Sequence, residues 1–239
     1  MRSSYLFRRW SAVLVFGTAI ACGCRPAKAQ SDPGLEHVLD LMDKARESFR
    51  SAEASLVWDV YTSVVQETDT QKGKVSYRRQ GNETQMALEF TDPSPKYVVF
   101  MGGKLQLFEP RLNRVTVYDA QKNQGEVESF LVLGFGGGGH VLEKSYDLKY
   151  LGTEKVAGVD AVKLGLVPKN PKVLNMFPNI VLWIDPVRGI SVQQQFFQQG
   201  GDYRLSKYSD IQLNRKIPDS VFKLKTDGKT SFQSMSPHD

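Results

Sequence analysis

The chain has few of the side chains that usually ligate metals or act as nucleophiles and general bases. Its 239 residues include two cysteines, Cys22 and Cys24, and three histidines, His37, His140 and His238. No group of histidines, cysteines and carboxylates has the spacing of a metal site. Because both cysteines lie near the N-terminus, the rest of the chain has no disulfide and no thiol chemistry. We therefore expect no metal ion.

Catalytic motifs are also missing. There is no Gly-x-Ser-x-Gly nucleophile elbow, and the carboxylates are scattered along solvent-type faces rather than paired as in glycosidases. The stretch Gly134–Gly139 (GFGGGG) lacks the Gly-Lys-Ser/Thr ending of a phosphate-binding loop. We expect a protein that needs no cofactor and is not an enzyme. Catalysis is the most remote of the functions considered.

The segment Met1–Ala29 has the organisation of a secretory signal peptide. It begins with a positive region at Arg8 and Arg9, and its apolar run, Trp10–Ala21, is too short to cross a bilayer comfortably. Ala27-Lys28-Ala29 then places small residues where a signal peptidase cleaves. The sequence therefore predicts export to the periplasm.

An excess of basic charge is missing from the mature chain. The signal peptide holds five of the 31 lysines and arginines and none of the 26 acidic residues, so 26 of each sign remain. A formal charge of zero removes the main support for nucleic acid as a partner. No later apolar run is long enough to span a membrane.

Lipoprotein processing is an alternative for the N-terminus. Ala19-Ile20-Ala21-Cys22 resembles a lipidation site, and Cys24 is a second candidate. The leucine that usually stands three residues before the cysteine is missing from both. A lipid anchor at Cys22 or Cys24 would tether the protein to a membrane.

Period-two alternation of apolar and polar residues is what the chain has in abundance. In Leu105–Glu109 and Arg114–Asp119 it predicts two strands, and Pro110–Asn113 between them has the residues of a tight turn. Similar runs, punctuated by Gly-Asn, Asp-Pro and Gly-Gly, recur about every ten residues, which is typical of an antiparallel meander. We expect about ten or eleven strands.

Helical spacing occurs at two places. Leu35–Phe49 follows an Asp-Pro start and predicts an amphipathic helix of about four turns. Gln124–Phe135 predicts a short apolar helix that runs into four glycines. Because glycines have no side chains to pack, we expect a mobile joint there. The elements indicate an α+β domain over residues 30–233, followed by a flexible tail, Ser234–Asp239.

The strands carry more apolar residues than a flat sheet needs to cover one face. The plainer interpretation is an ordinary packed core, and the alternative is an incompletely filled cavity beneath a lid formed by the Gln124–Phe135 helix. We favour the cavity, with Phe130, Leu131 and Phe135 on its lid. The residues that could share the apolar face are Leu56, Trp58, Val60, Met86, Leu88, Phe90, Val98, Phe100, Leu105, Leu107, Val115 and Val117, extended by Val181, Trp183, Phe196 and Leu205. The candidates for the cavity lining are Leu56, Trp58, Val60, Met86, Leu88, Phe90, Phe100, Leu107 and Trp183.

Gly73–Asp119 (GKVSYRRQ…YVVFMGGKLQLFEPRLNRVTVYD) resembles the periplasmic lipoprotein carrier family LolA. Members of that family show a glycine-led strand, a basic pair and a Gly-Lys-Leu hairpin with proline before the turn. Later segments follow in the family's order: Ile180–Asp185 (IVLWID), Leu213-Asn214, Ile217-Pro218, Val221-Phe222 and Asp227-Gly228. The resemblance spans most of the mature chain.

This resemblance implies an unclosed antiparallel β-barrel covered by helices, with a hydrophobic cavity for the acyl chains of lipoproteins. The family's characteristic arginine falls on Arg79, with Arg78 as the neighbouring register, and in the family it ties the barrel to the lid. The implied function is that of a chaperone in lipoprotein transport. Such a monomeric carrier receives its lipid cargo from an inner-membrane releasing complex and hands it to an outer-membrane acceptor.

Other functions stay open at this point. A membrane-tethered lipoprotein acceptor, or a binding module that senses lipids or stress, could use the same cavity. A purely structural sheet protein would instead have a filled core.

Overall fold

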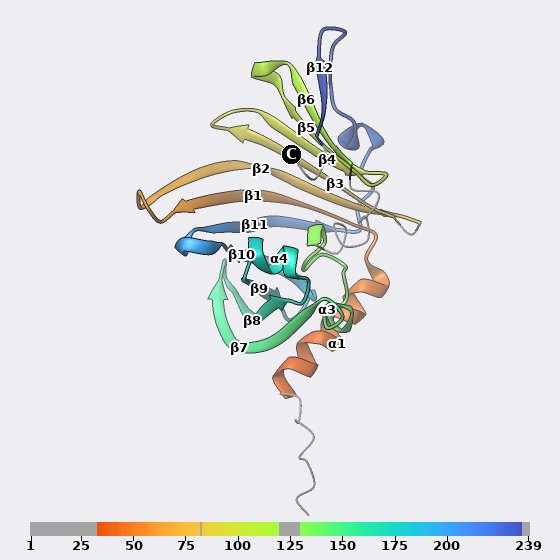
Figure 1. The fold of residues 1–239 in the computed structure, drawn as a ribbon. Coiled ribbons are helices and arrows are strands. Elements are labelled where there is room, and N and C mark those ends of the chain that lie inside the picture. The colour runs from red at the N-terminus through yellow and green to blue at the C-terminus, as the bar shows by residue number, and fades with distance from the viewer. Residues whose placement is uncertain (1–32, 82, 120–129, 236–239) are drawn as a thin grey trace, which may run out of the picture. The chain divides into compact units, whose positions relative to one another are not determined.

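The computed structural model describes residues 33–81, 83–119 and 130–235, which are organised around one large sheet (Figure 1). The chain divides into the units Met1–Gln30 and Ser31–Asp239, and only the second contains described residues. The predicted signal peptide, the lipidation candidates Cys22 and Cys24, and the first part of the predicted lid helix, 124–129, therefore lie outside the described residues.

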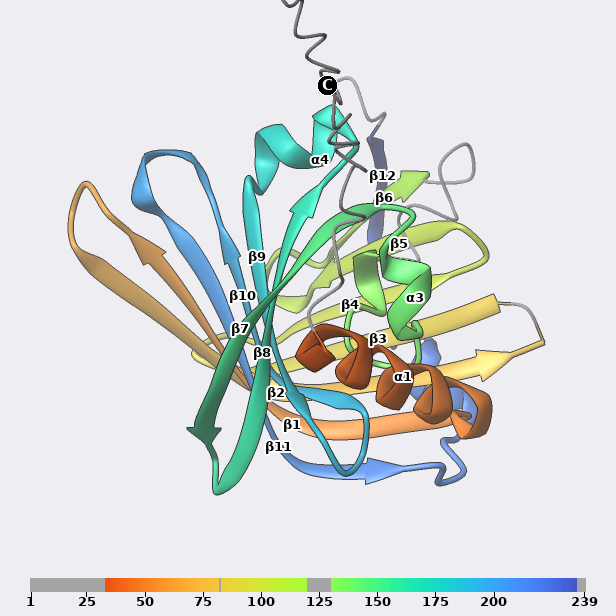
Figure 2. The ribbon, with the colours of Figure 1, turned by 90° about the horizontal axis from the view of Figure 1, so that it is seen from below.

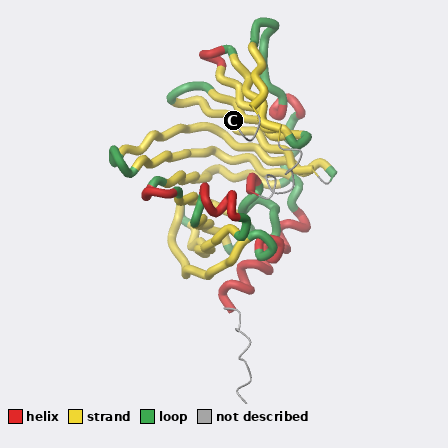
Figure 3. Tube along the Cα trace, viewed as in Figure 1, coloured by secondary structure: helices red, strands yellow, loops and turns green. Residues whose placement is uncertain are grey.

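Strands make up most of the described chain (Figure 3). They are β1 (Ser51–Thr62), β2 (Glu67–Gln80), β3 (Glu83–Asp92), β4 (Lys96–Met101), β5 (Lys104–Glu109), β6 (Arg114–Asp119), β7 (Tyr146–Val156), β8 (Val159–Pro168), β9 (Asn179–Asp185), β10 (Ile190–Phe197), β11 (Tyr203–Leu213) and β12 (Ser231–Met235). They form a 12-stranded sheet in the order β12-β6-β5-β4-β3-β2-β1-β11-β10-β9-β8-β7 across the described residues. No pairing between described residues joins β12 to β7, so the sheet stays open.

The predicted fold class, an α+β unclosed antiparallel barrel with a helical lid, is confirmed. The described chain has one strand more than the largest expected number, because β12 pairs with β6 in parallel. Ser234 and Met235 belong to β12 and pair with Val117 and Tyr118, so the expectation that the flexible tail begins at Ser234 is wrong for these two residues. Residues 236–239 lie outside the described part.

The long predicted helix is present as α1 (Pro33–Ser48). Its buried residues Val38, Leu39 and Met42 pack in one cluster with Leu164 and Leu182 of β8 and β9. The shorter helices are α3 (Gly139–Leu142), α4 (Pro171–Met176) and the 3-10 turns η1 (Pro110–Leu112), η3 (Gln199–Gly201) and η4 (Asp219–Phe222). α1 and α3 lie side by side (Figure 2).

The hairpin of β5 and β6 has the predicted strands and turn. Pro110 begins η1, and Asn113 follows it in the left-handed conformation, with φ of 44°, that lets the chain return. The expected faces are partly wrong, because Leu107 pairs with Thr116 and Phe108 pairs with Val115. Directly opposite residues share a face, so Val115 lies with Phe108 and not with Leu107.

The two faces of the sheet carry different clusters. We call the face that α1 and residues 130–136 cover the inner face; Leu56, Tyr77 and Phe100 lie on it with Phe135. On the outer face, Ala87 and Val99 pack against Ile217 and Phe222 of the segment that contains η4. The segment before β12 therefore covers part of the outer face.

The glycine run, which the sequence led us to expect as a mobile joint, is packed closely against α1 and Phe49. A Cβ atom on Gly139 would overlap the backbone of Leu39, and one on Gly136, where φ is +72°, would overlap the ring of Phe49. Glycine is needed here because the two backbones approach so closely. Because these glycines have no side chains, the glycine run can lie close to α1 and Phe49.

Candidate functional site

An apolar pocket lies between the inner face of the sheet and Phe130 and Leu131, the two described residues of the predicted lid that are helical. Its volume is about 190 Å³. The sheet supplies one wall, Phe130 and Leu131 supply a second, and Phe177, which follows α4, closes a third side. The described residues that line the pocket are Leu56, Trp58, Tyr77, Met86, Leu88, Phe90, Phe130, Leu131, Phe177, Gln194, Phe196, Arg204, Ser206 and Tyr208.

Seven residues selected from the sequence meet at this pocket. They are Leu56, Trp58, Met86, Leu88, Phe90, Phe130 and Leu131. They come together because the register places Leu56 opposite Gly73 and Gly73 opposite Phe90. A Cβ on Gly73 would overlap the backbone of Glu89, so the glycine allows β2 and β3 to approach at this bulge.

Five other selected residues do not line the pocket. Phe100 is 1% exposed and Phe135 is also 1% exposed, so both are part of the packed core. Val60 and Leu107 are half-buried on the inner face beyond the pocket. Trp183 lies on the outer face, where it packs with Val181 and donates its indole N–H to Glu154 at 3.2 Å.

Trp183 was misplaced because its hydrophobicity does not reveal its face. Along β9, Ile180 and Leu182 belong to the inner cluster, whereas Val181 and Trp183 belong to the outer one. Leu205 pairs with Asp59 on the outer face as well, so among the expected extensions only Phe196 reaches the pocket. Because β9 is apolar on both faces, its sequence does not show which of its residues point to the inner face.

The remaining lining residues were missed by sequence reasoning. They are Tyr77, Phe177, Gln194, Arg204, Ser206 and Tyr208. Gln194, Ser206 and Tyr208 are polar, so an apolar pattern could not find them. Pairing of β11 with β1 brings Tyr208 opposite Leu56 and Ser206 opposite Trp58. The alternation of β11, combined with this register, could have shown that Tyr208 and Ser206 face the pocket.

Aromatic rings form the side of the pocket beneath the lid. Phe130 lies 5.5 Å from Phe177 and 5.2 Å from Phe196 between ring centroids. Trp58 and Phe90 stack at 5.3 Å on the sheet side. These distances are typical of favourable aromatic pairs, so the ring of Phe130 is held by aromatic contacts.

The segment that follows the lid is fastened to the sheet through its carbonyl groups. The side-chain amide of Gln194 donates to Leu133 O, and the backbone N–H of Ser191 donates to Gly134 O at 2.7 Å. Arg79 Nη2 donates to Gly136 O at 2.8 Å. The base of the lid is therefore fixed, while Phe130 and Leu131 above it rest on apolar contacts.

Two buried tyrosines, Tyr77 and Tyr208, are part of the pocket lining. The ring of Phe135 stacks on Tyr77 at 4.8 Å and meets Tyr208 edge-on at 5.0 Å. Burial raises the pKa of Tyr208 to about 12 and raises the pKa of Tyr77 well above its usual range. Tyr208 donates its hydroxyl to Gln194 Oε1 at 3.1 Å. Both phenols are therefore neutral at physiological pH and are poor bases.

Arg79 joins three parts of the inner side. Besides Gly136 O, its guanidinium contacts Arg46 O at 3.1 Å, and its backbone N–H donates to Arg50 O at 2.8 Å. Burial, and then the positive charges of Arg46 and Arg50, lower the pKa of Arg79. The residue links β2 to the end of α1 and to the base of the lid.

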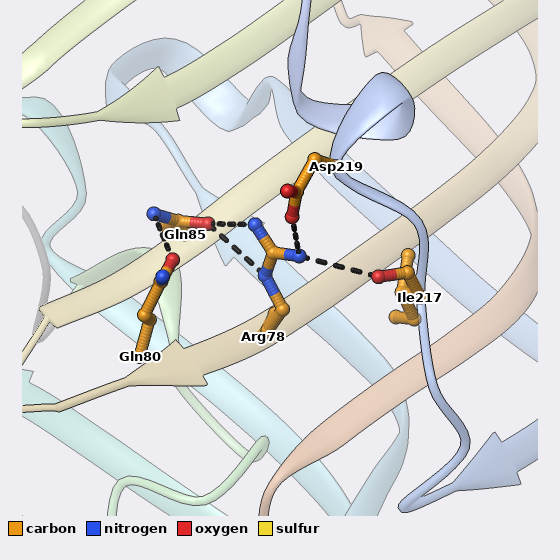
Figure 4. A network of polar contacts seen from close by, with 5 residues as sticks. All are labelled: Arg78, Gln80, Gln85, Ile217 and Asp219. Carbon is orange, nitrogen blue, oxygen red and sulfur yellow. Dashed lines mark hydrogen bonds and ion pairs between the residues drawn. The ribbon is translucent and has the colours of Figure 1, made fainter.

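Arg78 points to the outer face (Figure 4). It donates to Asp219 at 2.6 Å and to Ile217 O at 3.2 Å, and it also contacts Gln85. Its guanidinium lies 4.3 Å from the ring centroid of Phe222. Of the two registers left open by the sequence, Arg79 is the one that faces the lid.

The described residues contain no group of three or more histidines, cysteines and carboxylates placed to hold a metal ion. No described helix combines the length and the apolar character needed to cross a membrane. The pocket lining of the described chain likewise includes no aspartate, glutamate, histidine or cysteine. What the arrangement offers is shelter for an apolar group.

Comparisons with known proteins identify a family and several solved structures of similar fold. The sequence model of the MucB/RseB N-terminal domain matches residues 44–223. A crystal structure of MucB is 14% identical, with a TM-score of 0.52 over 84% of this chain and 65% of that one. An uncharacterised conserved protein from Thermus thermophilus is 12% identical, with a TM-score of 0.53 over 84% and 98%.

A LolA superfamily protein from Nitrosomonas europaea is 17% identical, with a TM-score of 0.40 over 80% of this chain and 97% of that one. This chain spans about two thirds of the MucB chain it matches, 65%. The comparison with curated proteins gave no match. The family match covers well over half of the sequence, and the chain therefore belongs to the MucB/RseB N-terminal domain family, whose fold is LolA-like.

Proposed function

We propose that this protein is a periplasmic lipid-binding module that shelters an acyl chain in the pocket beneath Phe130 and Leu131. In its carrier form it takes the acyl chain of a lipoprotein or lipid from one membrane and passes it to an acceptor. The observation that supports this most directly is a pocket of about 190 Å³, walled by aromatic and aliphatic side chains under a lid.

The energy of such binding comes from removing hydrocarbon from water. Each buried methylene contributes about 0.8 kcal/mol, so even a short segment of chain gives useful affinity. The contacts are non-directional and leave no strong bond to break at release. Loading and unloading then depend on the relative affinity of donor and receiver, because the sequence has no nucleotide-binding motif to supply energy.

The size of the pocket limits what it holds in the conformation described. A cavity of about 150 Å³ lined by similar side chains accepts one benzene molecule. A pocket of about 190 Å³ therefore accepts part of one acyl chain. Entry of a whole chain requires displacement of Phe130 and Leu131, which lie above the fixed base of the lid.

The experiment is a binding titration with a fluorescent fatty acid. Phe130→Glu places a carboxylate among Phe177 and Phe196, so affinity is expected to fall about tenfold or more, while the thermal unfolding curve stays cooperative. Val187→Glu, at a side chain that is 89% exposed, is the matched control and should bind as the parent does. Unchanged retention of the fatty acid by Phe130→Glu would refute the lid.

A second candidate function is a lipid-sensing or stress-sensing module of the same fold. The family match favours it, since MucB has also been solved as a complex with MucA from Pseudomonas aeruginosa. Native mass spectrometry of protein purified from the envelope separates the two. A carrier would retain lipid or acylated protein, whereas a sensor would retain a protein partner that added lipid displaces.

A membrane-tethered acceptor is the third form of the proposal. It requires acylation at Cys22 or Cys24 rather than cleavage after Ala29. The mass of the mature N-terminus decides between them, because an acylated cysteine adds the mass of its lipid and a cleaved chain begins at Gln30.

A further inference from the structure

The pocket contains one charged side chain among its described lining residues, Arg204. Arg204 is the second residue of β11, and pairing places it opposite Val60 on one side and Phe196 on the other. It therefore lies at the Val60 end of the pocket. Tyr77, which pairs with Ala52 at the opposite end of β1, marks the other end.

Two aromatic rings lie near the guanidinium group of Arg204. Its Cζ atom lies 5.9 Å from the ring centroid of Trp58 and 5.9 Å from that of Phe177. Cation–π contact of this kind holds the charge over the rings. Contact of this kind supplies no hydrogen-bond acceptor atom, so the guanidinium N–H groups keep their capacity to donate.

Part of the hydrogen-bonding capacity of Arg204 is not used by the described protein. Its Nε atom is buried and has no hydrogen-bond partner, and Arg204 forms no ion pair with any carboxylate of the described chain. Arg78 and Arg188, by contrast, pair with Asp219 and Asp185 at 2.6 Å. A cation that is partly desolvated and unpaired favours an incoming anion.

We propose that Arg204 binds the anionic end group of a single-chain amphiphile, whose hydrocarbon tail extends along β1 toward Met86 and Tyr77. The inference rests on the proposed function of the pocket and adds a charge requirement to it. Carboxylate and phosphate share the chemistry, because each accepts two N–H bonds from a guanidinium fork. A neutral end group offers the guanidinium a weaker acceptor, and a cationic end group is repelled by it.

The test compares amphiphiles that differ only in their end group: decanoate, decyl phosphate, decanol and decyltrimethylammonium. Each displaces a neutral fluorescent hydrocarbon probe from the full-length mature protein at neutral pH. Decanoate or decyl phosphate should bind about tenfold tighter than decanol, and the cation should bind weakest. The order of the two anions distinguishes a carboxylate ligand from a phosphate ligand.

Variants of Arg204 test whether this residue causes the preference for anionic end groups. Arg204→Met should bring the two anions to within about twofold of decanol without weakening decanol. Arg204→Lys should keep part of the preference, because it keeps the charge but loses the fork. Arg111→Met, at an exposed arginine in η1, removes the same charge away from the pocket and should leave the preference intact.

The outcomes separate the two proposals. If no amphiphile displaces the probe and the probe itself does not bind, the pocket function and the charge requirement both fail. If decanol binds as tightly as decanoate in the parent, or Arg204→Met keeps the preference for anions, the charge requirement alone is overturned. Near-UV circular dichroism of Arg204→Met and Arg204→Lys checks that each variant keeps the native fold.

Discussion

Arg78 and Arg79 leave β2 on opposite faces and hold different parts of the chain. Arg79 contacts carbonyls at the end of α1 and at the base of the lid, whereas Arg78 pairs with Asp219 on the outer face. Consecutive residues of a strand point in opposite directions, so one basic pair can serve both sides of a sheet. The two arginines are therefore a matched pair for mutation.

Arg79→Met should loosen the lid. It removes two hydrogen bonds from a charged donor, to Arg46 O and Gly136 O, and should lower the free energy of unfolding by about 1–3 kcal/mol. The dissociation rate of a bound fluorescent fatty acid should rise, because the base of the lid loses an anchor. Chemical denaturation and stopped-flow release measure the two effects.

Arg78→Met is the control for this prediction. It should also lower stability, since it breaks the contacts to Asp219 and Ile217 O, but it should leave lipid release unchanged. Equal acceleration of release by both variants would mean that general destabilisation, and not the Arg79 contacts, controls the lid.

Single-residue placement also shows what the sequence could and could not predict. Leu56, Trp58 and Phe90 were placed at the pocket because their strands alternate clearly. Trp183 was misplaced because both faces of β9 are apolar. The face to which each β9 residue points becomes clear only when the pairing with β8 and β10 is known. Arg204 was missed because a charged residue contradicts an apolar pattern, and only its neighbours reveal its role.

At the scale of elements, the contact between α1 and the glycine run is the feature that sequence reasoning misjudged. Both elements were expected, yet the glycines were interpreted as a mobile joint because they have no side chains to pack. The chain instead uses Gly139 to approach the backbone of Leu39 and Gly136 to approach the ring of Phe49. Close approach and flexibility require the same residue type, so composition alone does not distinguish them.

Replacing single glycines by alanine tests this account. Gly139→Ala puts a methyl group into the backbone of Leu39 and should lower the free energy of unfolding by about 1–3 kcal/mol. Gly137→Ala should change stability little or raise it, because its new Cβ would lie 3.4 Å from Val132 O, an ordinary contact. Denaturant titrations of the two variants provide the comparison, and a similar small effect of both would support an unpacked joint.

The same pair of helices carries a pH-dependent contact. His140 Nδ1 of α3 lies 2.5 Å from Asp43 Oδ2 of α1, and Nε2 lies 3.3 Å from Glu36 Oε2. The hydrogen bond with Asp43 raises the pKa of His140, assisted by Glu36 and the charge of Glu143 and opposed by its slight burial. The protonated imidazole therefore links α1 to α3.

This contact should make stability depend on pH in a defined direction. Because the pKa of His140 is higher in the folded state, its stabilisation is complete below the ordinary value of 6.5 and is lost as pH rises through the folded pKa. His140→Gln should reduce the change of melting temperature with pH across that range, as thermal unfolding at several pH values would show. His37→Gln, at an exposed histidine of α1, should retain the slope.

At the scale of the whole described domain, the architecture followed from patterns that many residues share. Alternation, turn residues and one amphipathic helix predicted an α+β domain dominated by an antiparallel sheet. The resemblance to LolA added that the sheet is unclosed and covered by helices. The strand β12 escaped prediction because all its residues are exposed, so it has no buried face to produce a pattern. The pocket's dimensions escaped it too, since they depend on how far the lid descends onto the sheet.

Those dimensions lead to a prediction about chain length. From hexanoate upward, the affinity for fatty acids should rise about fourfold for each added methylene, since each contributes about 0.8 kcal/mol when buried. The rise should level off when the tail fills the pocket, at about seven or eight carbons if volume scales from a benzene cavity of about 150 Å³. Isothermal titration calorimetry with a series from hexanoate to hexadecanoate measures the slope and the plateau.

Phe130 should set the position of that plateau. Phe130→Ala removes the ring that contacts Phe177 and Phe196, so the rise should continue to longer chains before it levels off. Phe232→Ala, at a ring that is 63% exposed on β12, should leave the plateau where it was. If affinity in the parent keeps rising at the same rate up to hexadecanoate, the lid moves aside for a tail of any length in this series. The lid would then control entry to the pocket but not the length of chain that it holds. A plateau that Phe130→Ala does not move would place the limiting wall on the sheet side of the pocket, where Trp58 stacks on Phe90.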